Sequence, residues 1–138
     1  MDTAIQEVKN YSDLELKPKI LLVEDDIICQ FVQKRILESY GYQVDIAGTG
    51  AQALLMFGDH YVGVVLDVDL PDMKGFQVSK TIRERETHKH TPIIGVTSHG
   101  DEIRAECLAA GYDEVTSKPA NTVKLGNILQ QFLPNGRL

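Results

Sequence analysis

Acidic, hydroxyl and amine side chains follow the short apolar runs of this sequence, each at the point where a run ends. They are Glu24, Asp25 and Asp26 after the first run, Asp67 after the third, Thr97 and Ser98 after the fourth, and Ser117, Lys118 and Pro119 after the fifth. Carboxylates held close together raise one another's pKa unless a cation neutralises them. A few carboxylates, with water and one backbone carbonyl, suit Mg²⁺. With a lysine and a threonine beside the metal, such a set would hold a phosphoryl group, and a central carboxylate would serve as the nucleophile that forms an acyl phosphate.

The apolar runs predict five strands that alternate with five helices. The predicted strands are 19–24, 42–47, 61–66, 92–96 and 114–116. The predicted helices run from Ile28 to a stop at Gly41, over 50–57, 75–87 and 101–110, and from a cap at Asn121 through Phe132. Such alternation indicates a parallel sheet with helices on both faces, a three-layer, doubly wound α/β fold. In these folds the active crevice lies at the carboxyl ends of the strands, where the candidate residues are.

The first helix carries two apolar sets, and Asp26 is predicted to cap it. Ile28, Val32 and Ile36 recur at helical spacing and are predicted to face the core. Ile27 and Phe31 lie four residues apart, outside this stripe. An exposed apolar pair would suit docking of a partner helix. Neighbouring loops would equally well bury it, and the sequence leaves both interpretations open.

Composition and charge limit the classes of function. The chain has 138 residues, 43% hydrophobic and 25% charged, which fits one globular domain. Its net charge of −6 argues against direct nucleic-acid binding. No apolar run reaches the roughly 18 residues of a membrane span, and no secretory signal is visible, so we expect a cytoplasmic location. Residues 1–18 are predicted to be an N-terminal extension or linker, with room for a short helix near 5–11. Cys29 and Cys107 match no metal-ligand spacing and are expected to be reduced thiols.

Four segments, in this order, resemble the receiver domains of two-component and phosphorelay signalling. Residues 19–26 (KILLVEDD) resemble the first strand and acidic pair of that family, and residues 65–75 (VLDVDLPDMKG) resemble its phosphoacceptor motif. Residues 92–98 (PIIGVTS) resemble the strand that ends in a hydroxyl, and residues 117–119 (SKP) resemble the Lys-Pro signature. The sequence is most similar to the receivers of hybrid histidine kinases, and the resemblance covers nearly the whole chain after the extension.

The resemblance implies a flavodoxin-like sheet in the order 2-1-3-4-5, a receiver domain over 19–133 and a C-terminal tail over 134–138. It also implies a role for each matching residue. Asp67 would accept a phosphoryl group from a phosphohistidine. Mg²⁺ or Mn²⁺ would be bound by Asp25, Asp67 and the backbone carbonyl of Asp69 directly, and by Glu24 through water. Thr97 and Lys118 would contact the phosphoryl group, and a cis bond before Pro119 would aim the lysine into the site.

The implied partner is a histidine kinase or a histidine phosphotransfer domain, and Ile27 and Phe31 are the candidate partner surface if they are exposed. The fourth helix, fifth strand and fifth helix would respond to phosphorylation and would allow a weak dimer. The domain would catalyse only its own phosphorylation and dephosphorylation, so we do not expect an enzyme that acts on external substrates. The sequence leaves open whether the receiver stands alone or belongs to a longer hybrid histidine kinase.

Three positions bear on how such a receiver would behave. Val115 stands where the family usually carries Tyr or Phe, which turns inward on activation, so the usual aromatic switch is not expected. His99, two residues after Thr97, resembles receivers attached to hybrid histidine kinases, although an inert exposed side chain is an equal alternative. Asp69, two residues after Asp67, is expected to alter the rate of phosphate loss.

The main alternative is a phosphatase of the haloacid-dehalogenase type. Residues 64–69 (VVLDVD) resemble the nucleophile motif of that family, with Asp67 as nucleophile and Asp69 as general acid. That family, however, places its metal-binding acids after the lysine, whereas Glu24 and Asp25 precede Asp67. The chain is also short for that fold. A phosphorylation-independent scaffold is disfavoured by the full set of site residues, and a flavin-binding module by the three acids that stand where a phosphate loop would be.

Overall fold

The computed structural model describes residues 17–87 and 89–133. Its centre is a five-stranded parallel sheet in the order β2-β1-β3-β4-β5. The strands are β1 (Lys19–Val23), β2 (Gln43–Ala47), β3 (Tyr61–Leu66), β4 (Ile93–Thr97) and β5 (Glu114–Ser117). The order and the parallel pairing confirm the predicted sheet. Residues 1–16 of the extension predicted over 1–18, where a short helix near 5–11 was allowed for, and the tail over 134–138 lie outside the described residues, so the domain boundaries stay predictions.

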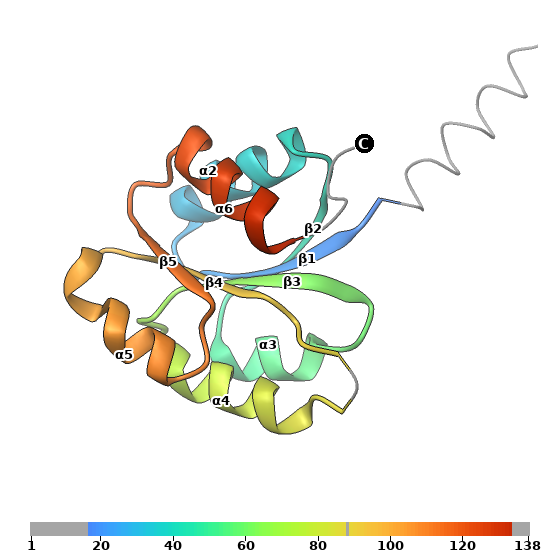
Figure 1. Ribbon diagram of the computed structural model, residues 1–138, viewed down its shortest axis with the longest axis vertical. Coiled ribbons are helices and arrows are strands. Elements are labelled where there is room, and N and C mark those ends of the chain that lie inside the picture. The colour runs from blue at the N-terminus through green and yellow to red at the C-terminus, as the bar shows by residue number, and fades with distance from the viewer. Residues whose placement is uncertain (1–16, 88, 134–138) are drawn as a thin grey trace, which may run out of the picture.

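Within the part of the chain that the structure describes, five α-helices cover the two faces of the sheet, as predicted (Figure 1). α2 (Ile27–Ser39) and α6 (Thr122–Phe132) lie on one face, and α3 (Gly50–Met56), α4 (Gly75–Arg85) and α5 (Arg104–Ala109) lie on the other. The predicted helix over 101–110 begins as a short 3₁₀ helix, Gly100–Ile103, and becomes α-helical only at Arg104. The result is the expected three-layer arrangement.

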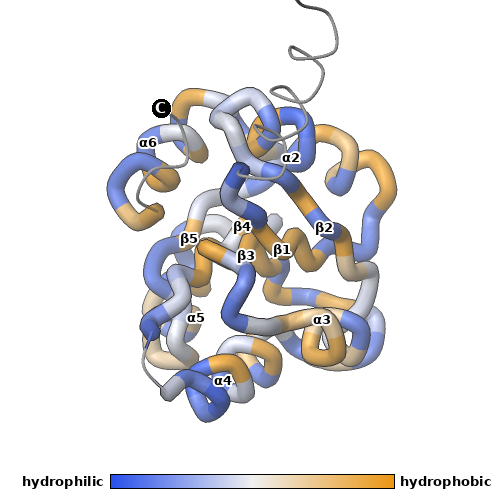
Figure 2. The backbone as a smooth tube through the Cα atoms, turned by 90° about the vertical axis from the view of Figure 1, so that its right-hand side faces the viewer, coloured by the Kyte–Doolittle hydropathy of each residue, from blue (hydrophilic) through white to orange (hydrophobic). Residues whose placement is uncertain are grey.

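Each face of the sheet has its own apolar core. Leu21 and Val23 of β1 belong to the core under α3, α4 and α5, whereas Ile20 and Leu22 belong to the core under α2 and α6. Successive side chains of a strand point to opposite faces, so a strand with no polar interior residue needs cover on both sides. Figure 2 shows the central strands as mainly hydrophobic.

The predicted caps of α2 and α6 and the stop at Gly41 are confirmed by their local geometry, whereas α4 ends at Arg85, before the predicted residue 87. The Asp26 carboxylate accepts a hydrogen bond from Cys29 N at 2.9 Å, and the Asn121 side chain accepts one from Lys124 N at 3.0 Å. Gly41 follows α2 with a φ of 95°, a conformation that glycine adopts without a steric penalty. These short-range signals fix where α2 and α6 begin and where the chain leaves α2.

The inner face of α2 differs from the prediction. Gln33, Ile36 and Leu37 are buried, whereas Ile28 is 74% exposed and Val32 is 38% exposed. The expectation that Ile28 and Val32 face the core is therefore wrong. Residues 33, 36 and 37 share one helix face, and the buried amide of Gln33 reaches Glu24. Apolar periodicity missed this face because one of its three buried residues is polar.

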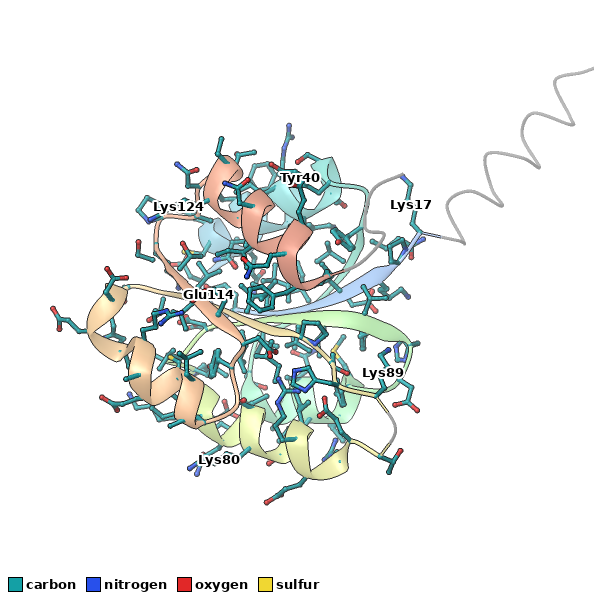
Figure 3. All side chains as sticks on the ribbon, viewed as in Figure 1. Lys17, Tyr40, Lys80, Lys89, Glu114 and Lys124 are labelled. Carbon is teal, nitrogen blue, oxygen red and sulfur yellow. The ribbon has the colours of Figure 1, made fainter. Side chains whose placement is uncertain are left out.

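Two side chains tie neighbouring elements together. Tyr40, labelled in Figure 3, lies where α2 meets α6, and its hydroxyl donates to the carbonyl oxygen of Thr122 at 3.0 Å. Arg83 of α4 donates to the carbonyl oxygens of Gly111 at 2.7 Å and Thr91 at 2.8 Å, and pairs with Asp113 at 2.9 Å. Arg83 thereby binds the segments that lead into β4 and β5 to the end of α4.

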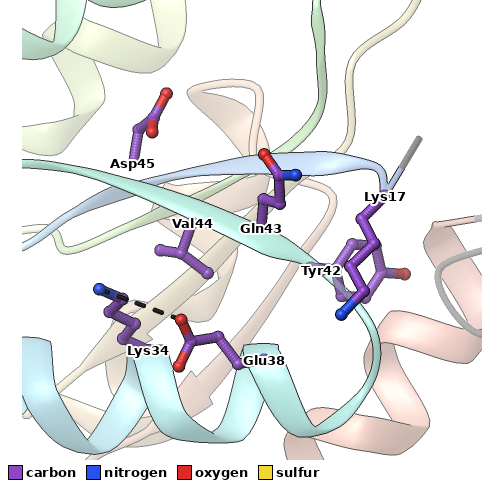
Figure 4. A pocket seen from close by; sticks show the side chains of 7 residues that line it. All are labelled: Lys17, Lys34, Glu38, Tyr42, Gln43, Val44 and Asp45. Carbon is purple, nitrogen blue, oxygen red and sulfur yellow. Dashed lines mark ion pairs between the residues drawn. The ribbon is translucent and has the colours of Figure 1, made fainter. Parts of the chain in front are cut away.

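A hollow of about 330 Å³ opens beside the amino end of β2 (Figure 4). It is lined by Lys17, Lys34, Glu38, Tyr42, Gln43, Val44 and Asp45. None of these is a candidate site residue, so the hollow is separate from the residues that the sequence singled out.

Within residues 17–87 and 89–133, no helix is long and apolar enough to span a membrane.

Candidate functional site

The carboxylates of Glu24, Asp25 and Asp67 meet at the carboxyl ends of β1 and β3. The two strands pair with Val23 opposite Leu66, so the residues that follow them come side by side. Asp67 N continues the pairing by donating to the Val23 carbonyl at 3.0 Å. One oxygen from each carboxylate lies within 4.8 Å of the other two. Glu24 and Asp67 are buried, and Asp25 is exposed.

Lys118 enters this acidic group from the end of β5. Its ammonium lies 2.7 Å from Glu24 Oε1 and 2.9 Å from Asp67 Oδ2. Its backbone N–H donates to the Thr97 carbonyl at 2.8 Å, which extends the β4–β5 pairing by one residue. It reaches the edge of the sheet where the carboxyl ends of the strands lie, which we call the rim. The Lys118–Pro119 peptide bond is cis, as the resemblance to receiver domains implied. The sheet thus brings residues from three strand ends into one cluster.

Burial shapes the charges of this cluster. Burial raises the pKa of Glu24 above its usual value and the nearby Asp67 adds to the effect, while hydrogen bonds from Lys118 and from Asp26 N partly oppose it. Burial alone would lower the pKa of Lys118, but its hydrogen bonds to Glu24 and Asp67 raise that pKa well above the usual value. The lysine is therefore a fully charged counter-ion at neutral pH.

The donor chemistry of the cluster fits a divalent cation. Within residues 17–87 and 89–133, Lys118 is the one cationic side chain in contact with Glu24 or Asp67, so a single ammonium faces three carboxylates. The remaining negative charge favours binding of a further cation. Carboxylate oxygens are the hard ligands that Mg²⁺ prefers.

Thr97 and Val115 lie on the neighbouring strands. Thr97 ends β4 with its side chain fully buried, and its hydroxyl accepts a hydrogen bond from His99 N at 3.2 Å. Thr97 pairs with Ser117 in the β4–β5 register, which puts it on the same rim as Lys118. Val115 is partly buried and packs on the core under α3, α4 and α5. The Thr97 hydroxyl therefore lies at the rim, as expected, and the residue at position 115 is an aliphatic valine that belongs to the core.

The comparison with protein families decides the identity of the domain. Residues 20–130 match the model of the response regulator receiver domain. The chain belongs to this family. The receiver is 36% identical over 130 residues to the hybrid signal transduction histidine kinase L of Dictyostelium discoideum, a match that covers 88% of this chain and 8% of that protein. It is 36% identical over 115 residues to the aerobic respiration control sensor protein ArcB of Escherichia coli, covering 82% of this chain and 15% of that protein.

Solved receiver structures have the same fold. The receiver domain of a sensor histidine kinase of Pseudomonas aeruginosa, with a magnesium ion coordinated in its active-site cleft, is 33% identical, with a TM-score of 0.74 over 83% of this chain and 96% of that chain. The response regulator TrrA of Thermotoga maritima, in complex with Mg²⁺ and BeF, is 30% identical, with a TM-score of 0.75 over 84% of this chain and 99% of that chain. These matches support a receiver and not the haloacid-dehalogenase alternative.

A polar network on the rim of the receiver was only partly foreseen. His99 Nε2 contacts Asp69 Oδ2, and Lys74 Nζ contacts the other oxygen of the same carboxylate at 2.5 Å. The pKa of Asp69 lies below its usual value, mainly because of the hydrogen bond from Lys74; burial opposes this, and His99 lowers the pKa further. His99 is exposed, as one of the two interpretations expected, and its ring contacts Asp69; a role for it stays a prediction. Asp69 and Lys74 also form an isolated antiparallel bridge, a local pairing between residues five apart in the loop after β3.

Tyr112 is a further residue that the sequence analysis did not single out. It is 3% exposed, and its hydroxyl donates to the backbone carbonyl of Asp67 at 3.3 Å. A Cβ at Gly75 would lie 2.2 Å from that hydroxyl, and a Cβ at Gly95 would lie 3.1 Å from the ring. The ring therefore fills a space that two glycines leave open beneath the candidate phosphoacceptor. Its position could not be read from spacing, because it depends on packing between three separate elements.

The apolar residues at the start of α2 form an exposed patch. Ile27 is 78% exposed and Phe31 is 63% exposed. Neighbouring loops therefore do not bury them, and that alternative is wrong. Ile28 and Val32 widen the patch, since they too lie outside the core. The guanidinium of Arg35 lies 5.7 Å from the centroid of the Phe31 ring, within the range of a cation–π contact.

Proposed function

We propose that this receiver accepts a phosphoryl group from a phosphohistidine onto the carboxylate of Asp67. The observation that carries the proposal is the buried position of this carboxylate among Glu24, Asp25 and Lys118. An Asp67 oxygen would attack the phosphorus, the phosphorus–nitrogen bond would break, and the leaving imidazole would take up a proton. The products are an acyl phosphate on Asp67 and an unmodified histidine on the donor.

Two residues would stabilise the transferred group. Lys118, already 2.9 Å from Asp67 Oδ2, would pair with a phosphoryl oxygen, since its ammonium is charged and partly desolvated. The Thr97 hydroxyl would move toward the group and donate to another oxygen, giving up its contact with His99 N. Pro119 would keep Lys118 directed inward. Because Val115 replaces the usual aromatic residue, the surface response would not use a rotating ring.

We infer that Mg²⁺ is the cofactor. Asp25, Asp67 and the backbone carbonyl of Asp69 would hold it directly, and Glu24 would hold it through water. The fit rests on the three clustered carboxylates and their single ammonium partner. When bound, Mg²⁺ neutralises charge on the phosphoryl oxygens, so that an anionic carboxylate can approach an anionic donor. Mn²⁺ prefers the same oxygen ligands and would substitute.

The donor would be a histidine kinase or a histidine phosphotransfer domain. The exposed patch around Ile27 and Phe31 lies at the start of α2, directly after the acidic residues at the end of β1. A helix of the donor that packs on this patch would bring its phosphohistidine to the site. We further propose that the domain acts as a relay in a hybrid histidine kinase, since such kinases are among its relatives.

Three other properties belong to the same proposal. The domain would phosphorylate and dephosphorylate itself, and would not be an enzyme acting on external substrates. The face formed by α5, β5 and α6 would change on phosphorylation and would allow a weak dimer. A cytoplasmic location suits the two free cysteines, Cys29 and Cys107, because reducing compartments preserve thiols.

Intact mass after incubation with acetyl phosphate and Mg²⁺ tests the phosphoacceptor. We expect one added phosphoryl group, which is absent with EDTA and absent in Asp67→Asn. The matched control is Asp59→Asn, which makes the same change at an exposed aspartate away from the cluster. Absence of both an adduct and Asp67-dependent phosphate release, even with a phosphorylated histidine phosphotransfer domain, would overturn the proposal.

The choice of donor tests the docking patch. Phe31→Ala and Ile27→Ala would slow phosphotransfer from a histidine phosphotransfer domain and leave the rate with acetyl phosphate unchanged, because the small donor needs no docking surface. Leu55→Ala, at an 87% exposed leucine on the other face of the sheet, provides the control. Equal rates for all three variants with the protein donor would exclude this patch.

A further inference from the structure

Two glutamines on α2 are hydrogen-bonded to Glu24. Gln30 Nε2 donates to the backbone carbonyl of Glu24 at 2.6 Å, and Gln33 Nε2 donates to the Glu24 carboxylate at 3.3 Å. The two glutamines lie three residues apart, on one side of the helix. α2 is thus hydrogen-bonded to both the main chain and the side chain of Glu24, the residue that follows β1.

Gln33 has no packing reason to be polar. It is 2% exposed, and its neighbours on the inner face of α2 are the apolar Ile36 and Leu37. A buried amide costs free energy unless it is hydrogen-bonded, and an aliphatic residue of similar length would fill the same space. The contact that distinguishes a glutamine from an aliphatic residue here is the one to Glu24.

The Glu24 carboxylate is held from several sides. Its Oε1 accepts a hydrogen bond from Gln33 Nε2 and forms an ion pair with the Lys118 ammonium. Its Oε2 accepts a hydrogen bond from Asp26 N at 3.0 Å. A ligand fixed in this way loses little freedom when it binds a cation, and groups that orient a metal ligand set much of its affinity. Gln33 is the member of this set that comes from the inner face of α2.

The same turns of α2 carry the exposed patch on the other side. Ile27, Ile28 and Phe31 face solvent while Gln30 and Gln33 face the site. We infer that Gln30 and Gln33 are positioning residues, which fix Glu24 for the metal and hold the docking helix in a set position beside it. The inference rests on the proposed function, because it takes the acidic group to be the magnesium site.

Magnesium affinity gives a test that does not depend on phosphorylation. In Gln33→Met the side chain keeps its length and loses its donor; the matched control is Gln130→Met, on the exposed face of α6. Amide chemical shifts followed during a MgCl₂ titration give the dissociation constant. We expect it to rise roughly 10-fold in Gln33→Met, the lower end of the effect of removing such an orienting group, and to stay unchanged in the control. Gln30→Met, at a half-buried position, repeats the test without altering the core.

The two phosphoryl donors separate positioning from docking. A residue that positions Glu24 slows acetyl phosphate and the protein donor by the same factor, whereas Phe31→Ala slows only the protein donor. Equal magnesium affinity in the unmodified chain, Gln33→Met and Gln30→Met would overturn the inference and leave the proposed function intact. Failure of the unmodified chain to bind magnesium or accept a phosphoryl group would remove the proposed function, and the inference with it.

Discussion

Lys118 and Glu24 form an ion pair of 2.7 Å in which the carboxylate is buried and the lysine side chain is 18% exposed. The same ammonium also contacts Asp67 at 2.9 Å. Two buried carboxylates therefore depend on one cation for their charge balance when no metal is bound. The stability of the domain and the affinity of its site for cations are linked through this lysine.

Replacing Lys118 by Met is expected to destabilise the domain by about 3 kcal/mol at neutral pH, because it leaves buried charges without a partner. Added Mg²⁺ should restore part of this loss, since it supplies the missing positive charge. Urea unfolding with and without MgCl₂ measures both effects. Lys34→Met is the control, because Lys34 pairs with Glu38 at 4.0 Å on the surface, where an ion pair contributes less than about 1 kcal/mol. Equal losses in the two variants would contradict the linkage.

Gly75→Ala should destabilise the domain by about 3 kcal/mol. The new Cβ would lie 2.2 Å from the Asp67 carbonyl oxygen and 3.0 Å from Val68 Cα, and backbone atoms cannot move aside as a flexible side chain can. Gly48→Ala is the matched control, because its nearest neighbour would be Gln52 Oε1 at 3.9 Å. The measurement is the free energy of unfolding in urea. If Gly75→Ala were no worse than Gly48→Ala, the close packing of α4 beneath the site would be in error.

Asp72 should contribute a pH-dependent part of the stability. Its two oxygens accept hydrogen bonds from Gly50 N and Ala51 N, each at 2.9 Å, and these lower its pKa below the usual 3.8. A carboxyl group whose pKa is lower in the folded than in the unfolded state stabilises the fold at pH values above the unfolded-state pKa. This contribution is lost as the pH falls through the folded-state pKa. The urea midpoint of Asp72→Ala should therefore lie below that of the unmodified chain at pH 7, with the gap closing below about pH 3.8. A gap independent of pH would show that the carboxylate charge is irrelevant.

Breaking the contact between His99 and Asp69 should shorten the life of the acyl phosphate. The contact joins the segments after β3 and β4 across the rim, and without it the loop that follows Thr97 would be held less firmly beside Asp67. A hydrogen bond worth about 1 kcal/mol corresponds to roughly five-fold faster hydrolysis in His99→Ala. His90→Ala is the control, because His90 pairs with Asp113 at 2.8 Å, away from the acidic cluster. Decay of the phosphorylated mass gives the rates, and an unchanged lifetime in His99→Ala would count against the rim contact.

Much of this architecture was predictable because it follows short-range rules. The apolar run 20–23 needs cover on both faces, Asp26 and Asn121 have the chemistry of helix caps, and Gly41 accepts a positive φ. The acidic cluster was predictable for a related reason, since parallel strands place their carboxyl ends at one edge. The caps and the turn need only the residue and its immediate neighbours, whereas the cluster also needs the parallel pairing of the strands.

The inner face of α2 was not predictable from apolar periodicity. Gln33 is buried because Glu24 gives its amide a partner, and that partner lies nine residues earlier, outside any helical pattern. The contact of Asp69 with His99 spans 30 residues, and that of Tyr112 with the Asp67 carbonyl spans 45. Such polar contacts depend on how the layers stack, and stacking is not encoded in a local window.

The attachment of Arg83 has a mechanical consequence. Arg83 donates hydrogen bonds to the carbonyl oxygens of Thr91 and Gly111 and pairs with the carboxylate of Asp113. These contacts attach the amino ends of β4 and β5 to α4. The carboxyl ends of the same strands carry Thr97 and Lys118. If Thr97 moves, the amino ends of β4 and β5 would stay in place because Arg83 holds them. The two strands would therefore rotate about Arg83 and would not shift as a rigid unit.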